Sequence, residues 1–174
     1  MRQTAGAVLL VLLAGSTAPA ADVIESMGNV GAIALPASTL LIAAVHHDAR
    51  GAFQSAEAYA ATMAVVYILK PTINRRRPDG GSQSFPSGHT ASAFAGAAFL
   101  QRRYGWSYGI PAYAAAAFVG YSRVEAKRHH TSDVVAGAAL GIAGNLVFTR
   151  RYAHVAVHPT LQARGAGLAI EVGW

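Results

Sequence analysis

The sequence has no cysteine and few charged residues. The lack of cysteine excludes a disulfide framework, a thiolate metal site and a cysteine nucleophile together. Charged residues are 13% of the 174 positions, which is about half the usual share for a soluble domain. Most of the chain is therefore either buried within itself or in contact with lipid.

The charge that is present is mainly basic, with a formal net charge of +6. A basic chain can bind nucleic acid, anionic lipid or phosphate. The sequence has no pattern typical of a helix that reads a DNA groove or of an aromatic platform that stacks bases. We therefore expect no nucleic-acid partner.

The first 21 residues predict a secretory signal peptide. Arg2 supplies the positive start, residues 7–14 form a short apolar centre, and Ala18-Pro19-Ala20 gives a small-x-small cleavage site. We expect the mature chain to begin near Ala21 or Asp22. The alternative is a first transmembrane helix that stays attached, and either interpretation predicts an exported protein.

Five apolar segments follow, and each is too long for a typical strand. Their alanine-rich composition and sparse β-branching favour helix. The sequence therefore predicts one all-α domain over residues 22–152, a bundle of about five core helices. The predicted segments are Val30–Val45, Ala56–Leu69, His89–Leu100, Tyr108–Tyr121 and Val134–Phe148.

Whether this bundle spans a membrane is left open by the sequence. The segments have about 12 to 17 residues, and a bilayer needs about 20. The mean hydropathy of +0.31 is also modest. Yet so few charges leave little polar face for water, and the small residues suit close helix packing in lipid. We favour a membrane-embedded bundle over a soluble one.

The tail, residues 153–174, has a different pattern from the helices. Residues 154–161 and 167–174 partly alternate apolar and polar positions. This period of two predicts a short C-terminal β-hairpin, to which no function is assigned.

The first of three polar clusters lies at the end of the second segment. Lys70 is followed by Arg75, Arg76 and Arg77 before Pro78. Guanidinium groups match phosphate oxygens in a fixed, forked geometry. The cluster therefore predicts a phosphate site, and the alternative is a set of cations that flank a membrane helix.

The second cluster is Pro86-Ser87-Gly88-His89-Thr90, directly before an apolar helix. Ser87 is well placed as an N-cap, and Gly88 allows close approach to a ligand. The free N–H groups of the first helical turn form an anion site, which His89 would face. The alternative is an ordinary helix cap with an incidental histidine.

The third cluster contains Ser122-Arg123, then His129 and Asp133. On a helix, His129 and Asp133 at i and i+4 would share one face. The carboxylate could then accept the Nδ1–H of the imidazole and raise its nucleophilicity. His130 lacks such a partner, because Val134 stands at its i+4 position. The alternative is a His–Asp pair at a helix end with no catalytic role.

In this order the clusters resemble the type 2 phosphatidic acid phosphatase superfamily, over roughly residues 70–148. That superfamily includes bacterial acid phosphatases, lipid and polyprenyl pyrophosphate phosphatases, glucose-6-phosphatase and vanadium haloperoxidases. Its pattern is K-x6-R-P, then P-S-G-H, then S-R-x5-H-x3-D. All of the defining positions match in this chain: Lys70, Arg77, Pro78, Pro86, Ser87, Gly88, His89, Ser122, Arg123, His129 and Asp133.

The resemblance implies a role for each matching position. His129 would attack phosphorus and form a phosphohistidine, Asp133 would orient it, and His89 would protonate the leaving oxygen and then activate water. Hydrolysis would need no metal and no cofactor. The phosphoryl oxygens would be held by Lys70, Arg77, Ser87, Gly88 and Arg123.

We therefore expect a phosphatase for a phosphomonoester or diphosphate, with its active site on the outer face of a bacterial inner membrane or in the periplasm. The apolar composition favours a lipid or polyprenyl phosphate over a small soluble ester. Two alternatives are a vanadium-dependent haloperoxidase and a non-catalytic membrane protein that binds phosphorylated headgroups. The sequence does not indicate an oligomeric state.

Overall fold

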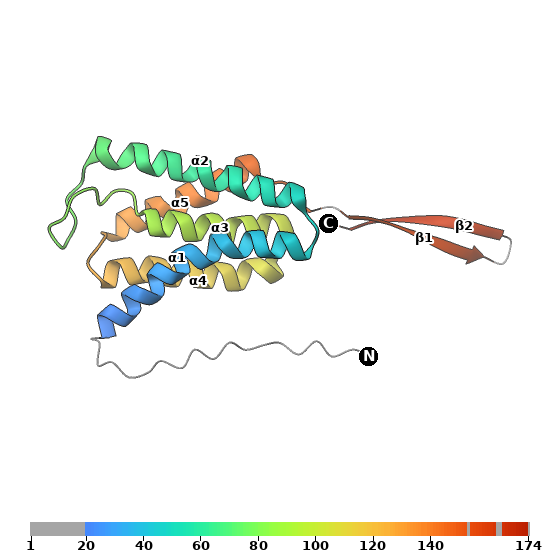
Figure 1. Cartoon of the computed structure of the whole chain (residues 1–174), viewed down its shortest axis with the longest axis horizontal. Coiled ribbons are helices and arrows are strands. Elements are labelled where there is room, and N and C mark those ends of the chain that lie inside the picture. Colours follow the sequence, from blue (N-terminus) through green and yellow to red (C-terminus); the bar gives the residue numbers. More distant parts are fainter. Residues whose placement is uncertain (1–19, 153, 163–164, 174) are drawn as a thin grey trace.

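A computed structural model describes residues 20–152, 154–162 and 165–173 of the chain. Five helices lie roughly side by side as a bundle (Figure 1). This confirms the predicted all-α class with five helices. The predicted signal peptide falls almost entirely on residues 1–19, outside the described residues. The helices are α1, Ala20–Val45; α2, Ala49–Ile73; α3, Gly88–Tyr104; α4, Trp106–Glu125; and α5, Thr131–Phe148.

Each helix is longer than the sequence predicted. The five have 26, 25, 17, 20 and 18 residues in chain order, whereas the apolar segments have about 12 to 17 residues. Polar and charged residues at the segment ends continue the helices, as Lys70 does in α2 and Arg103 in α3. Helices of about 17 to 25 predominantly apolar residues can cross a bilayer. Among the described helices, α1 and α5 meet both conditions, so the length argument against membrane spans does not hold for these two.

The helix ends carry recognisable caps. The Asp48 side chain accepts a hydrogen bond from the N–H of Gly51 at the start of α2, and Ser87 caps α3 through the N–H of Thr90. Asn74 ends α2 with a left-handed backbone, φ 43°. These caps satisfy N–H and C=O groups that a helix end leaves free, and they fix where the loops begin.

Helix α3 is the centre of the bundle and packs against the other four helices. Most of its residues are buried, and the majority of those are small. A Cβ atom on Gly141 of α5 would lie 2.6 Å from the carbonyl oxygen of Ala91 in α3, so only glycine allows this backbone approach. The core cluster consists of Ala32, Ala93, Ala97, Phe99, Leu100, Ala112, Ala116 and Val119.

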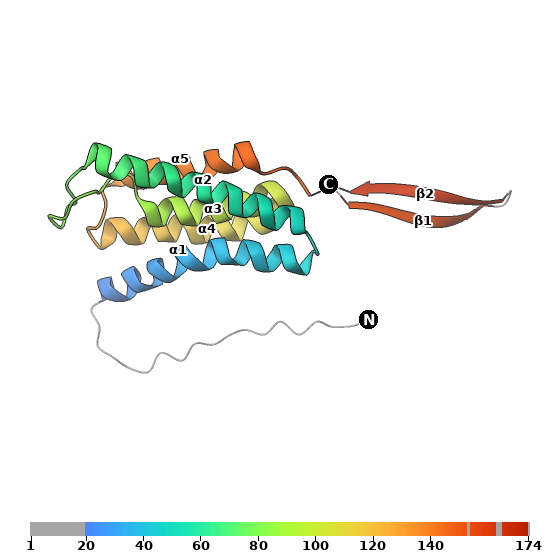
Figure 2. The same cartoon turned by 45° about the horizontal axis from the view of Figure 1, so that its top comes forward.

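The α2–α3 and α4–α5 loops lie at one end of the bundle, together with the start of α1 (Figures 1 and 2). Backbone hydrogen bonds join the two loops: the N–H of Asp79 donates to the carbonyl of Lys127, and that of Ser87 to the carbonyl of Asp133. All three sequence clusters therefore meet at this end.

Beyond the bundle the chain continues as β1, His154–Gln162, and β2, Gly165–Gly173. The two strands pair antiparallel, with His154 opposite Gly173 (Figure 1). The all-α class rests on the helices alone, and no function is assigned to the two strands.

Candidate active site

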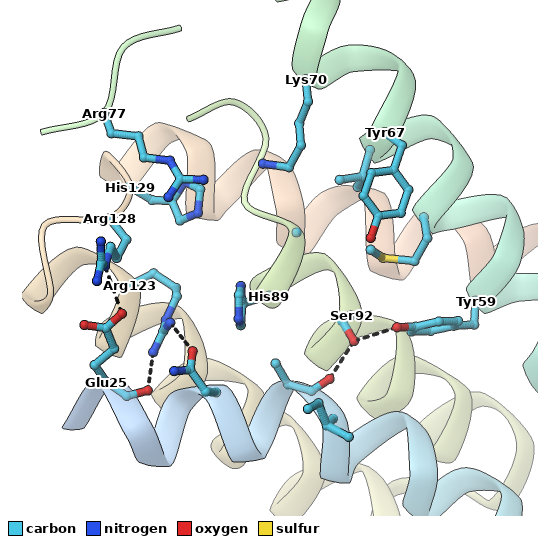
Figure 3. A pocket seen from close by; sticks show the side chains of 16 residues that line it. Glu25, Tyr59, Tyr67, Lys70, Arg77, His89, Ser92, Arg123, Arg128 and His129 are labelled. Atoms are coloured by element: carbon cyan, nitrogen blue, oxygen red, sulfur yellow. Dashed lines mark hydrogen bonds and ion pairs between the residues drawn. The ribbon is translucent and has the colours of Figure 1, made fainter. Parts of the chain in front are cut away.

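A pocket of about 420 Å³ opens at the end of the bundle that carries the three clusters. Figure 3 shows the side chains of Lys70, Arg77, His89, Arg123 and His129 around the same space. They come from α2, the α2–α3 loop, α3, α4 and the α4–α5 loop. The fold therefore brings together residues that lie up to 59 positions apart in the sequence. Six of the eight predicted site residues line the pocket: Lys70, Arg77, Gly88, His89, Arg123 and His129.

His129 lies in the α4–α5 loop, two residues before α5, and it is buried. Its Nδ1 atom is 2.7 Å from the backbone carbonyl oxygen of Ser84. A carbonyl oxygen can only accept, so Nδ1 carries the proton and Nε2 carries the lone pair. Burial, and then the charge of Lys70, lower the pKa of His129 to about 4. The imidazole is therefore neutral at neutral pH, with Nε2 free to act as a nucleophile.

The predicted direct hydrogen bond from His129 to Asp133 is not present. Since His129 precedes α5, the two residues do not share a helix face, and Nδ1 lies 3.9 Å from Asp133 Oδ2. The fully buried carboxylate instead accepts hydrogen bonds from the Ser84 hydroxyl at 2.5 Å, the His130 N–H at 2.9 Å and Arg75 Nη1 at 2.8 Å. Asp133 therefore fixes Ser84, and the backbone carbonyl of Ser84 in turn fixes the imidazole of His129.

The cations of the pocket differ in how many of their donors are occupied. Lys70 Nζ donates to the carbonyl of Gln83 at 2.9 Å. Arg123 is almost fully buried and donates to Ser122, Asn29 and Glu25. Arg77 Nε is the one buried side-chain nitrogen or oxygen without a hydrogen-bond partner in the described part of the chain. A buried donor left unpaired calls for a partner, and an anion in the pocket would supply one.

The start of α3 matches the second motif only in part. The backbone of Gly88 and the side chain of His89 face the pocket, and His89 is exposed. Ser87 caps α3 as predicted. Its hydroxyl is fully buried, lies 2.9 Å from the Thr90 hydroxyl and is not part of the pocket lining.

His130 lies outside the pocket. Its Nε2 atom is 3.1 Å from the carbonyl of Arg76, and the residue precedes the first turn of α5. The backbone N–H of His130 binds the Asp133 carboxylate, so the i, i+4 reason that separated the two histidines was wrong. The choice of His129 as the nucleophile stays a prediction.

The side of the pocket away from the cations is apolar. It is formed by residues of α1 and α2 that the motifs do not contain: Ala32, Ile33, Tyr59, Met63, Val66 and Tyr67. The same pocket therefore joins a strongly cationic end to a hydrophobic wall.

Several residues that hold the site were missed from the sequence. Ser84 contributes a backbone carbonyl, which every residue has, so no residue pattern marks it. Asn29 is a lone amide within the apolar stretch of α1, and a polar residue in such a helix is a usable signal for function. Arg75 belongs to the predicted phosphate-binding cluster, but it binds Asp133 instead. Glu25 and Arg128 stand outside the three motifs.

The chain matches known proteins in both sequence and fold. The model of the PAP2 superfamily matches residues 51–155. A lipid A 1-phosphatase of Porphyromonas gingivalis is 47% identical over 78 residues, which are 42% of this chain and 17% of that protein. The chain thus matches less than a fifth of that relative's length.

Two solved structures share the fold. A crystal structure of Aquifex aeolicus LpxE superimposes with a TM-score of 0.65 at 23% identity, covering 73% of this chain and 83% of the other. A transmembrane PAP2-type phosphatidylglycerolphosphate phosphatase from Bacillus subtilis gives a TM-score of 0.58, also at 23% identity, over 74% of each chain.

Proposed function

Because the chain belongs to the PAP2 superfamily, we propose that it is a metal-independent phosphatase acting on a lipid phosphate or diphosphate. The observation that carries this proposal is the composition of the pocket at the motif end of the bundle. Cations at one end suit a phosphoryl group, and the apolar wall of α1 and α2 suits a hydrocarbon chain. The partnerless Nε of Arg77 adds a donor for the phosphate.

The arrangement supports a two-step reaction through a phosphohistidine. Nε2 of His129 attacks phosphorus, the N–P bond forms, and the bond from phosphorus to the leaving oxygen breaks. His89 gives that oxygen a proton. In the second step His89 takes a proton from water, the water oxygen attacks phosphorus, and the N–P bond breaks to release inorganic phosphate.

Lys70, Arg77 and Arg123 would stabilise the charge on the phosphoryl oxygens during both steps. The N–H groups at the start of α3 would add to this field, as the N-terminus of a helix attracts anions. Such fixed donors need no rearrangement when the transition state forms. Arginine and lysine would therefore supply the charge stabilisation that a metal ion supplies in other phosphatases.

A lipid substrate fits the outside of the bundle as well as the pocket. Helices α1 and α5 are long and apolar enough to cross a membrane. In a soluble protein such helices would be mostly buried, yet only 22% of each apolar window is buried here. Large apolar side chains are exposed on both helices, among them Ile33 at 73% and Val147 at 76% exposure. Exposed apolar surface of this extent is typical of a lipid-facing protein.

The experiment that tests the function measures phosphate release by the detergent-solubilised full chain. The substrate panel holds a lipid A phosphate, a phosphatidate, a polyprenyl diphosphate and a soluble aryl phosphate, with His129→Ala as the inactive control. We expect release from at least one lipid substrate to exceed that from the aryl phosphate. Equal rates for all four would reject the lipid assignment, and no release above the control would reject the phosphatase.

The location is part of the same proposal. An exported chain with the site at the start of α1 would present its pocket on the outer face of the inner membrane. Intact spheroplasts should then hydrolyse a substrate that cannot cross the membrane. Activity that appears only after lysis, from a product that still begins at Met1, would reject this orientation and the cleavage of residues 1–21.

A further inference from the structure

The first turns of α1 lie directly against the guanidinium of Arg123. Nη1 of Arg123 donates to Asn29 Oδ1 at 2.6 Å, and Nη2 donates to the backbone carbonyl of Glu25 at 2.6 Å. Nε donates to Ser122 Oγ at 3.0 Å. Figure 3 shows Arg123 reaching from α4 to α1 at the edge of the pocket. The arginine is thus oriented by a helix that precedes the matched residues 51–155.

The contact depends on a close approach of the two helices. Glu25, Gly28 and Asn29 are spaced i, i+3 and i+4, so they share one face of α1. A Cβ atom on Gly28 would lie 1.9 Å from Ser122 Oγ and 2.5 Å from Arg123 Nη2. No other residue fits at position 28 unless α1 moves away from Arg123.

A second link joins α1 to the loop that carries the nucleophile. Glu25 Oε1 accepts from Arg128 Nε at 2.9 Å, and Arg128 directly precedes His129. The same residue of α1 therefore contacts Arg123 through its carbonyl and the α4–α5 loop through its carboxylate. The side chain of Asn29, in contrast, hydrogen-bonds to Arg123 and to no other residue in the described part of the chain.

We propose that Asn29 is a positioning residue of the phosphatase, which acts by fixing Arg123 for the phosphoryl group. A guanidinium has five N–H bonds, and three of them are held by Ser122, Asn29 and Glu25. Two remain, and Arg123 lines the pocket. Since a preorganised donor stabilises developing charge without reorganisation, the acceptor that fixes its angle contributes to the rate. The inference rests on the proposed function.

The test compares two substitutions of almost equal size. Asn29→Leu removes the acceptor, whereas Asn29→Asp keeps an oxygen at Oδ1. Loss of a complete transition-state donor lowers kcat by about 10² to 10³. For a displaced donor we expect a smaller loss in Asn29→Leu, roughly ten- to a hundredfold in kcat, with little change in KM. The kcat of Asn29→Asp should stay within about threefold of the wild-type value. The matched control is Val30→Ala, at an exposed position of α1 outside the pocket.

The Arg123→Lys background separates positioning from a general role in folding. Lysine has no guanidinium fork, so Asn29→Leu should cause no further loss of kcat there. Equal factors in both backgrounds, or a thermal midpoint that falls in proportion to kcat, would overturn the inference. So would an unchanged kcat in Asn29→Leu.

Vanadate binding by calorimetry gives a readout that does not need turnover. We expect Asn29→Leu to weaken orthovanadate binding by the same factor as kcat, because vanadate imitates the five-coordinate transition state. If no substrate is hydrolysed but vanadate binding still depends on Asn29, the proposed function fails and the positioning role stands. If substrates are hydrolysed and neither kcat nor vanadate binding changes in Asn29→Leu, the positioning role alone fails. Absence of both turnover and vanadate binding in the wild type would reject both.

Discussion

Replacing Asp133 by asparagine distinguishes a carboxylate that fixes the histidine tautomer from one that acts at a distance. In a direct His–Asp pair, the asparagine amide favours the wrong tautomer and lowers kcat by roughly 10⁴. Here the carbonyl of Ser84 accepts the Nδ1–H bond, and the substitution leaves that carbonyl in place. The tautomer should therefore survive in Asp133→Asn.

The remaining effect is electrostatic, and its size follows from the structure. Unit charges 3.9 Å apart, the distance from Nδ1 to Oδ2, attract by about 4 kcal/mol at an effective dielectric constant of about 20. In a loose transition state the N–P bond is only partly formed, so the imidazole has gained at most about half a charge. The loss should be at most about 2 kcal/mol, which is roughly 30-fold in kcat. Arg75 loses its carboxylate partner as well, but its side chain is 40% exposed, so water screens that change.

The assay measures kcat of Asp133→Asn in detergent micelles, with nitrogen NMR of the labelled imidazole as the test of the tautomer. Glu57→Gln is the control, because it neutralises an exposed carboxylate on α2 that is not in the pocket lining. A loss near 10⁴ in a folded protein, or a proton found on Nε2, would show that Asp133 itself fixes the tautomer. A kcat within twofold of wild type would show that the charge of Asp133 does not stabilise the transition state.

Four shorter predictions follow from the same geometry. His129→Ala should abolish phosphate release, whereas His130→Ala, at a residue outside the pocket, should keep most of it. The reverse result would show that His129 is not the nucleophile. Because the pKa of His129 is lowered to about 4, kcat/KM should decline at the acid side only through pH 4. Desolvation in the pocket, and then the charge of Arg123, lower the pKa of His89, the proton donor, below its usual value, so kcat/KM should rise as pH falls from 7 toward that pKa; an acid-side decline centred near 6.5 would contradict this. Phosphate release should survive EDTA and be inhibited by vanadate, and loss on chelation with rescue by magnesium or zinc would reject the metal-free mechanism. Asp48→Ala should lower the free energy of unfolding by about 3 to 5 kcal/mol, measured in denaturant, because it leaves the buried Arg103 without its carboxylate; a change below about 1 kcal/mol would contradict the role of this pair.

The helices and the meeting of the motif loops could be predicted because both rest on local signals. Alanine-rich segments and caps such as Ser87 mark helices, and an even number of helix reversals between the clusters places both motif loops at one end. The helix lengths were underestimated because the apolar segments were ended at the first charged residue. A helix can continue through a charged residue whose side chain finds partners: Lys70 of α2 lines the pocket, and the buried Arg103 of α3 pairs with Asp48.

The support of His129 could not be predicted because it depends on tertiary placement. The sequence shows which carboxylate is four residues away, but it does not show where α5 begins. With α5 starting at Thr131, His129 turns toward the α2–α3 loop and meets a carbonyl from Ser84, 45 residues earlier. Main-chain acceptors carry no residue signature, so only the fold reveals them.

The two ends of the bundle show why residue type alone did not separate structural from functional arginines. At the end away from the pocket, Arg103 donates to both oxygens of Asp48 and to the carbonyls of Arg150 and Arg151. Its donors are used to join the α1–α2 loop to the end of α5. At the pocket end, Arg77 Nε is buried without such a partner. Burying an unpaired donor of a charged group is unfavourable, and the fold retains it beside a neutral His129. The difference between Arg103 and Arg77 is the supply of protein acceptors around them, and the unpaired Nε of Arg77 is a donor that we assign to the phosphate.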